Sequence, residues 1–149
     1  MADIKVVKTD MEKAEKGVWV PFESGIELCI ASANSPEFRK ARSRVMKQFT
    51  RRIRSKSVNP DEVLEALKPV YAKHILVGWK NIEEDGQEVS YSANKALEYF
   101  RDPSLSIFFD FVLEASGDDE TFRMEDFEEA EKNSGQISGG SSDSKTPKS

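Results

Sequence analysis

Residues 18–30 read VWVPFESGIELCI, and this stretch decides the fold of the N-terminal part of the chain. Apolar and polar residues alternate on both sides of Glu23-Ser24-Gly25, which is the pattern of two strands joined by a turn. Gly25 readily adopts the left-handed backbone conformation that such turns use. Pro21 has no N–H to donate to a ladder, so its strand is expected at a sheet edge. The sequence therefore predicts a β-hairpin over residues 17–31.

Helical signals dominate the chain after the hairpin. A proline follows a capping residue at Ser35 and again at Asn59, which is typical of helix starts. From the first start, apolar residues recur every three or four positions and predict an amphipathic helix over residues 37–56. The apolar stripe of the second helix continues through Trp79, and we expect Pro69 to kink or split this helix.

Three shorter helices are expected in the second half of the chain. A tight turn at residues 85–86 precedes a helix that Ser92 caps. Residues 105–113 form the most apolar helix, which is apolar almost all round and therefore needs either a central core position or a covering partner. A last, acidic helix is predicted over residues 119–131.

These elements predict an α+β fold that is mostly α, with a small N-terminal β-hairpin followed by a compact bundle of about four to five helices. We expect a flexible N-terminus over residues 1–15 and a single domain over residues 16–132, whose helical part spans residues 35–132. Residues 133–149 are rich in Ser and Gly and nearly free of apolar side chains, which predicts a disordered C-terminal tail.

Length and composition indicate a soluble protein of the reducing cytoplasm. The 149 residues carry a formal net charge of -5, and the single cysteine cannot form an internal disulfide. The longest apolar stretch, residues 105–113, is far shorter than the roughly 20 residues that span a bilayer. No membrane association is therefore expected.

Positive and negative charges are segregated along the chain. Residues 39–56 contain nine basic side chains and no acid, whereas residues 110–131 contain ten acids and one arginine. The basic helix either forms a solvated face opposite the acidic one or tracks the phosphates of a nucleic acid. Its aromatic residues, Phe38 and Phe49, fall on the apolar stripe, so no base-stacking platform is visible. A small nucleic-acid-binding adaptor that uses residues 37–56 is thus the alternative reading.

The chain offers little apparatus for catalysis. One histidine and one cysteine cannot build a multi-His or Cys-rich metal centre, and no phosphate-binding loop or nucleophile motif is present. For His74 we favour packing or solvation over acid–base work, and for Cys29 a buried inert thiol over a nucleophile. We therefore expect no enzyme activity, no cofactor and no metal. Trp19 and Trp79 could anchor an interface, although core packing is favoured for each.

Several sequence pieces, in order, resemble the tail assembly chaperones of long-tailed, siphovirus-type bacteriophages. They cover about residues 15–134. The pieces are KGVWVPF at 16–22, IELCIA at 26–31, NSPEF at 34–38, ILVGWKNI at 75–82, DG at 85–86, YS at 91–92, Leu97, DPSL at 102–105, FR at 122–123 and EKNS at 131–134.

This resemblance implies a non-enzymatic protein of the host cytoplasm, absent from the mature virion, that keeps the tape measure protein soluble. Some members of that family also exist in a longer form, made by ribosomal frameshifting, that recruits the major tail tube protein. Self-association is expected from pairing of the basic and acidic faces. The residues expected to contact partners are Trp79, Phe108, Phe109, Phe111 and Phe122, together with the basic side chains Arg39, Arg42, Arg51 and Arg52.

Overall fold

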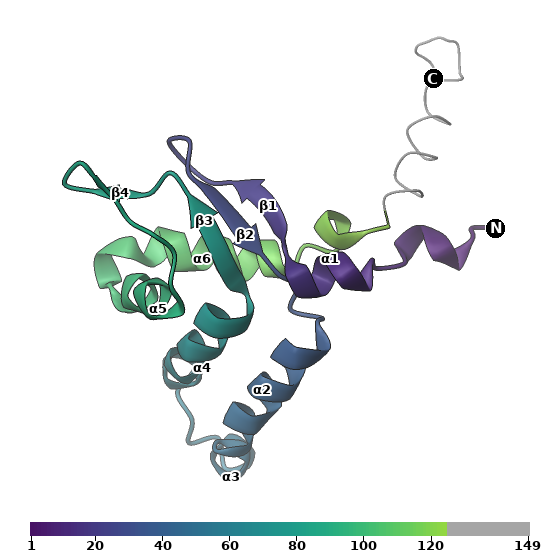
Figure 1. Cartoon of the computed structure of the whole chain (residues 1–149). Coiled ribbons are helices and arrows are strands. Elements are labelled where there is room, and N and C mark those ends of the chain that lie inside the picture. The colour runs from purple at the N-terminus through teal and green to yellow at the C-terminus, as the bar shows by residue number, and fades with distance from the viewer. Residues whose placement is uncertain (125–149) are drawn as a thin grey trace. The chain divides into compact units, whose positions relative to one another are not determined.

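The computed structural model describes residues 1–124, which fall into two units (Figure 1). The larger unit comprises residues 11–118, and the described part of the smaller unit comprises residues 1–10 and 119–124. The fold is mixed α+β with a small antiparallel sheet, as the sequence predicts.

The smaller unit joins the two ends of the described chain. It contains two 3-10 helices, η1 (Ile4–Val7) and η3 (Asp119–Phe122). An antiparallel bridge pairs Thr9 with Arg123, and the Asp10 amide donates to the Phe122 carbonyl at 2.7 Å. The predicted helix 119–131 is therefore a single 3-10 turn as far as the structure describes it. The predicted tail, 133–149, lies outside the described residues.

The sheet of the larger unit has the order β1-β2-β3. Strands β1 (Val18–Pro21) and β2 (Glu27–Ile30) form the predicted hairpin, in which Trp19 lies opposite Cys29. Positive φ angles at Ser24 (55°) and Gly25 (82°) close its turn. Because β1 is an edge strand, the missing N–H of Pro21 is tolerated.

The third strand corrects the sequence prediction around Trp79. Helix α4 (Pro60–His74) ends at His74, and β3 (Leu76–Lys80) pairs with β2, placing Trp79 opposite Leu28. A short apolar run such as residues 75–79 is compatible with a helix or with a strand, and the pairing with β2 decides in favour of a strand. Pro69 does not split α4, since it lies on the exposed side, where water can satisfy the carbonyl that loses its donor.

The predicted basic helix is two helices. Helix α2 (Pro36–Lys47) is followed by a turn and then by α3 (Thr50–Arg54). Phe49, in the turn, is buried although the residues beside it are exposed. We call α2 and α3 together the basic arm. In Figure 1, α3 lies at the end of α2 that is farther from the sheet.

Helices α5 (Ala93–Arg101) and α6 (Ser106–Ser116) complete the larger unit, with the 3-10 turn η2 (Pro103–Leu105) between them. Ser92 caps α5 as predicted, since its Oγ accepts a hydrogen bond from the Lys95 amide at 3.0 Å. The two-stranded hairpin of β4 (Glu83–Glu84) and β5 (Gln87–Glu88) precedes α5.

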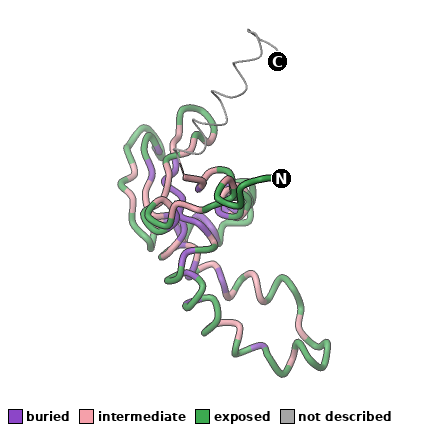
Figure 2. The backbone as a smooth tube through the Cα atoms, turned by 90° about the vertical axis from the view of Figure 1, so that its right-hand side faces the viewer, coloured by how far each residue is buried: buried purple, intermediate pink, exposed green. Residues whose placement is uncertain are grey.

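Buried side chains from the sheet, α2, α4, α5 and α6 form one core. Figure 2 colours the buried residues of the described chain purple. Its largest members include Phe38, Trp79, Phe100, Phe108 and Phe109. The sequence predicts a flexible N-terminus over residues 1–15, and the structure differs at the end of this segment. Residues Met11–Lys16 form helix α1, in which Ala14 is fully buried.

Candidate functional site: an acidic apolar groove

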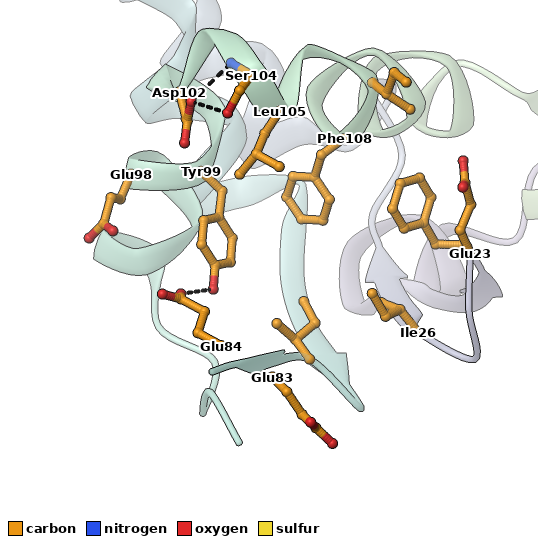
Figure 3. A pocket seen from close by; sticks show the side chains of 13 residues that line it. Glu23, Ile26, Glu83, Glu84, Glu98, Tyr99, Asp102, Ser104, Leu105 and Phe108 are labelled. Atoms are coloured by element: carbon orange, nitrogen blue, oxygen red, sulfur yellow. Dashed lines mark hydrogen bonds between the residues drawn. The ribbon is translucent and has the colours of Figure 1, made fainter. Parts of the chain in front are cut away.

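A hollow of the larger unit lies where the β1–β2 turn, the segment that carries β4, and the α5–α6 corner meet. It has a volume of about 500 Å³, and we call it the acidic groove. Figure 3 shows Tyr99, Leu105 and Phe108 on the helical side, with Glu83 and Glu84 on the other. The apolar lining consists of Phe22, Ile26, Ile82, Tyr99, Leu105, Ile107 and Phe108.

Part of this apolar lining is open to solvent. The exposed fraction is 66% for Ile107 and 37% for Leu105. Beneath them, Phe108 packs edge-on against Phe22 with ring centroids 5.7 Å apart. A firm aromatic floor with exposed aliphatic side chains above it is suited to receive an apolar side chain from a partner.

Carboxylates surround this apolar lining. The polar lining consists of Glu23, Glu83, Glu84, Glu98, Asp102 and Ser104, and the lining contains no lysine, arginine or histidine. A second hollow, of about 400 Å³, adjoins the groove across Phe22, Glu23 and Ile107 and adds Asp110 and Glu114. The whole region therefore carries a negative field that attracts cations.

The carboxylates differ in how far they are neutralised. On the α5 side, the Lys95 ammonium binds Glu84 at 3.1 Å and Glu98 at 2.9 Å. Within residues 1–124, no basic side chain pairs with Glu23, Glu83 or Asp110. The carboxylates without a basic partner thus lie at the β1–β2 turn, on β4 and on α6, and Asp102 at the α5–α6 corner likewise has no ion pair among the described residues.

One hydrogen bond fixes the α5 wall. The Tyr99 hydroxyl donates to Glu84, and this bond, followed by the contact with Lys95, lowers the pKa of the Glu84 carboxyl. Burial, together with the negative charge of Glu84, raises the pKa of Tyr99 to about 12. At neutral pH the phenol is therefore protonated and Glu84 is charged, so the pair holds the β4 segment against α5.

The basic arm is a second charged surface. Arg39, Arg42 and Arg51 are exposed and have no ion-pair partner among residues 1–124. Arg52 is different, since it binds both carboxylate oxygens of Glu62 on α4. Phe38 and Phe49 are buried, so no exposed aromatic side chain of the arm is placed to stack on a base.

The structure places most of the predicted aromatic contact residues in the interior. Trp79, Phe108, Phe109 and Phe122 are buried, and Phe111 is half-buried against Phe22, with ring centroids 5.0 Å apart. Of these, Phe108 lines the groove and Phe111 lines the adjoining hollow. The predicted core position of Trp79 is confirmed.

Trp19, also expected in the core, is 43% exposed, and this expectation is wrong. Its ring lies beside Gly78 and 4.2 Å from the Lys80 ammonium. Trp19 stands on β1, which is an edge strand of the described sheet.

Sequence reasoning missed Ile107 and the unpaired carboxylates Glu23 and Glu83. The only signal for Ile107 was the nearly all-round apolar character of residues 105–113, which predicted either a core position or a covered surface. Both hold in part, because α6 buries Phe108, Phe109 and Val112 and exposes Ile107.

The two side chains considered for chemistry are placed as follows. Burial raises the pKa of the Cys29 thiol, which donates weakly to the Lys16 carbonyl at 3.7 Å. Partial burial, and then the charge of Lys73, lower the pKa of His74. Among residues 1–124, no cluster of three or more His, Cys, Asp or Glu side chains is arranged to hold a metal ion.

No helix in the same range combines the length and apolar composition that a membrane span requires.

Comparison with known families decides the origin of the chain. The model of the YdaY prophage protein family matches residues 33–133, which is more than half of the sequence. This chain belongs to the YdaY prophage protein family. No curated protein and no solved structure gives a significant match. The match to the YdaY family confirms a phage-related protein. Among the described residues, the matched region runs from just before the basic arm to residue 124.

Proposed function

We propose that this YdaY-family protein is a phage tail assembly chaperone. It catalyses no reaction, binds the tape measure protein in the host cytoplasm and keeps it soluble. Through a frameshift-extended form it helps to recruit the tail tube subunit, and it then dissociates. The sequence resemblance and the phage family support this role.

The observation that carries the proposal is the acidic groove, because it leaves Ile107 and Leu105 open on a folded chain. A tape measure protein is long and helical, and an amphipathic helix binds by laying its apolar face into such a groove. The surrounding carboxylates make the contact selective and reversible, since charged rims affect encounter and register more than affinity. Reversibility is what a chaperone requires.

Co-expression tests this proposal. The tape measure protein of the same prophage is produced alone, with the wild-type chain, and with the variant Ile107→Asp. We expect the wild-type chain to raise the soluble fraction of the tape measure protein, and Ile107→Asp to lose this effect because it places a charge on the apolar lining. Ala93→Asp, an equally charged change at an exposed helical position outside the groove, is the matched control. A tape measure protein that is equally insoluble with and without the wild-type chain contradicts the proposal.

The unpaired arginines of the basic arm favour a second candidate, a nucleic-acid-binding adaptor. Phosphate contacts weaken steeply as salt rises. Binding of a DNA or RNA oligonucleotide that is lost in Arg39→Glu/Arg42→Glu and at high salt supports the adaptor. Equal, negligible binding of the wild-type chain and this variant contradicts it.

A further inference from the structure

The tip of the basic arm carries an exposed apolar side chain between two cations. Ile53, in α3, is 43% exposed, and the residues next to it in the sequence are the positively charged Arg52 and Arg54. Arg51 and Arg54 have no carboxylate partner among residues 1–124. Arg52 is engaged with Glu62 and fixes α3 against the first turn of α4. The tip is thus a positively charged helical turn with one aliphatic side chain open to solvent.

The acidic groove has the complementary chemistry. Its most exposed aliphatic side chain is Ile107, and its unpaired carboxylates include Glu23 and Glu83. One surface presents an apolar residue flanked by arginines, and the other presents an apolar residue in a lining that includes unpaired carboxylates. Two surfaces with matched apolar contact and opposite charge are expected to associate.

Both surfaces belong to the larger unit, but they lie at different places on it. The groove is formed by the β1–β2 turn, the β4 segment and the α5–α6 corner, whereas α3 lies at the far end of the α2–α4 pair (Figure 1). With α3 tied to the first turn of α4 by the Arg52–Glu62 contact, the tip lies away from the groove of its own molecule. A complementary contact therefore needs a second copy of the chain.

We propose that the acidic groove of one molecule binds the α3 tip of another, with Ile53 against Ile107 and with Arg51 and Arg54 facing Glu23 and Glu83. The contact is heterologous, so each bound molecule presents a further groove and a further tip, and rings or open filaments result. One helical turn in one groove buries far less than the roughly 1,200 Å² of a standard interface, which places this contact among the weak and transient ones. Its charged rim makes it sensitive to salt.

This inference goes beyond the proposed function, since it concerns the chain in the absence of any phage partner. Both use the groove, but only self-association uses the α3 tip. A variant altered at the tip therefore separates them. Arg51→Glu/Arg54→Glu is expected to stop self-association and still to solubilise the tape measure protein, because its groove is intact.

Sedimentation velocity over a concentration series at low and high salt tests the inference on the full chain. We expect the sedimentation coefficient of the wild-type chain to rise with concentration at low salt and to rise much less at high salt. Glu23→Lys/Glu83→Lys and Arg51→Glu/Arg54→Glu each weaken association by at least about tenfold, because each reverses two close charge pairs. Mixing the two variants restores association, since every contact between a groove variant and a tip variant again joins opposite charges.

Matched controls keep the charge change and move its position. Glu15→Lys/Glu37→Lys alters exposed carboxylates outside the groove lining, and Arg39→Glu/Arg42→Glu alters the arm away from its tip. Both are expected to associate much more strongly than the groove and tip variants. Circular dichroism checks that each variant is folded. Ile53→Asp, at an exposed position, tests the same contact from the other side if the groove variant does not fold.

Three outcomes overturn the inference. The first is a wild-type chain that stays monomeric over the whole concentration range at low salt. The second is folded groove and tip variants that associate as the wild-type chain does. The third is a mixture of the two variants that fails to associate although each variant alone has lost association.

Discussion

Arg52 and Glu62 form a two-point ion pair that ties α3 to the first turn of α4. The Nη1 and Nη2 atoms of Arg52 donate to Oε2 and Oε1 of Glu62 at 2.6 and 2.7 Å. The Nη2 atom also donates to the Ser57 carbonyl at 3.3 Å, which closes the loop between the two helices. Parallel hydrogen bonds of this kind fix orientation as well as distance. The pair therefore determines where the tip of the basic arm points.

The Arg52–Glu62 pair predicts a pH dependence. The hydrogen bonds from Arg52 lower the pKa of the Glu62 carboxyl. Because this folded-state pKa is depressed, the stabilisation is present above the ordinary carboxyl pKa and is lost as pH falls through the lowered one. An NMR titration of the Glu62 carboxyl carbon is expected to show a lower pKa in the wild-type chain than in Arg52→Gln. The same pKa in both proteins contradicts the ion pair.

Helix α6 predicts opposite outcomes at two nearby positions. Phe109 is buried and packs against Phe100, with ring centroids 4.7 Å apart, so Phe109→Ala is expected to cost about 3–5 kcal/mol of unfolding free energy. Ile107 is mostly exposed, so Ile107→Ala is expected to change that free energy by no more than about 0.5 kcal/mol. Urea denaturation measures both. Equal effects at the two positions contradict the described orientation of α6.

Trp79 provides a polar contact within the core. Its Nε1 donates to the Val89 carbonyl at 2.8 Å and so ties the chain after β5 to strand β3. Trp79→Phe leaves this partly buried carbonyl without its donor, which is expected to cost about 1–3 kcal/mol in chemical denaturation. Trp19→Phe is the matched control and should cost much less, because Trp19 is largely exposed. A Trp79 variant as stable as the Trp19 variant rules out a contribution from this bond.

Gly17 joins α1 to β1 in a conformation that other residues avoid. Its φ is +93°, and a Cβ there would lie 2.8 Å from Cys29 Sγ. Gly17→Ala is therefore expected to lower the thermal midpoint and to cost more than about 1 kcal/mol. Gly117, which has a φ of -97° and no contact closer than 3.8 Å, is the control. Gly117→Ala should be neutral or should stabilise the chain, and a harmless Gly17→Ala would contradict the described turn.

Local signals in the sequence were sufficient for some elements and not for others. The β1–β2 hairpin and the start of α5 follow from an alternating pattern and from a capping serine, which act over a few residues. The end of α4 does not, since no glycine or proline lies within three residues after His74 and the strand at Leu76 depends on pairing with β2, which is distant in sequence.

The groove could not be predicted for a related reason. Residues 105–113 are apolar on almost every side, so their pattern does not distinguish buried Phe108 from exposed Ile107. That difference depends on how α6 meets the β1–β2 turn and the β4 segment, which is a property of tertiary packing. The charge of the basic arm, in contrast, was evident from the sequence alone.

The central claim is that the acidic groove is the surface that binds the tape measure protein. Hydrogen–deuterium exchange measures it most directly, by comparing the co-purified complex with the free chain at a concentration where the chain is monomeric. The account predicts slower exchange at residues 22–26, 82–84 and 98–108 in the complex. A complex in which these segments exchange as in the free chain, with protection elsewhere, would contradict it.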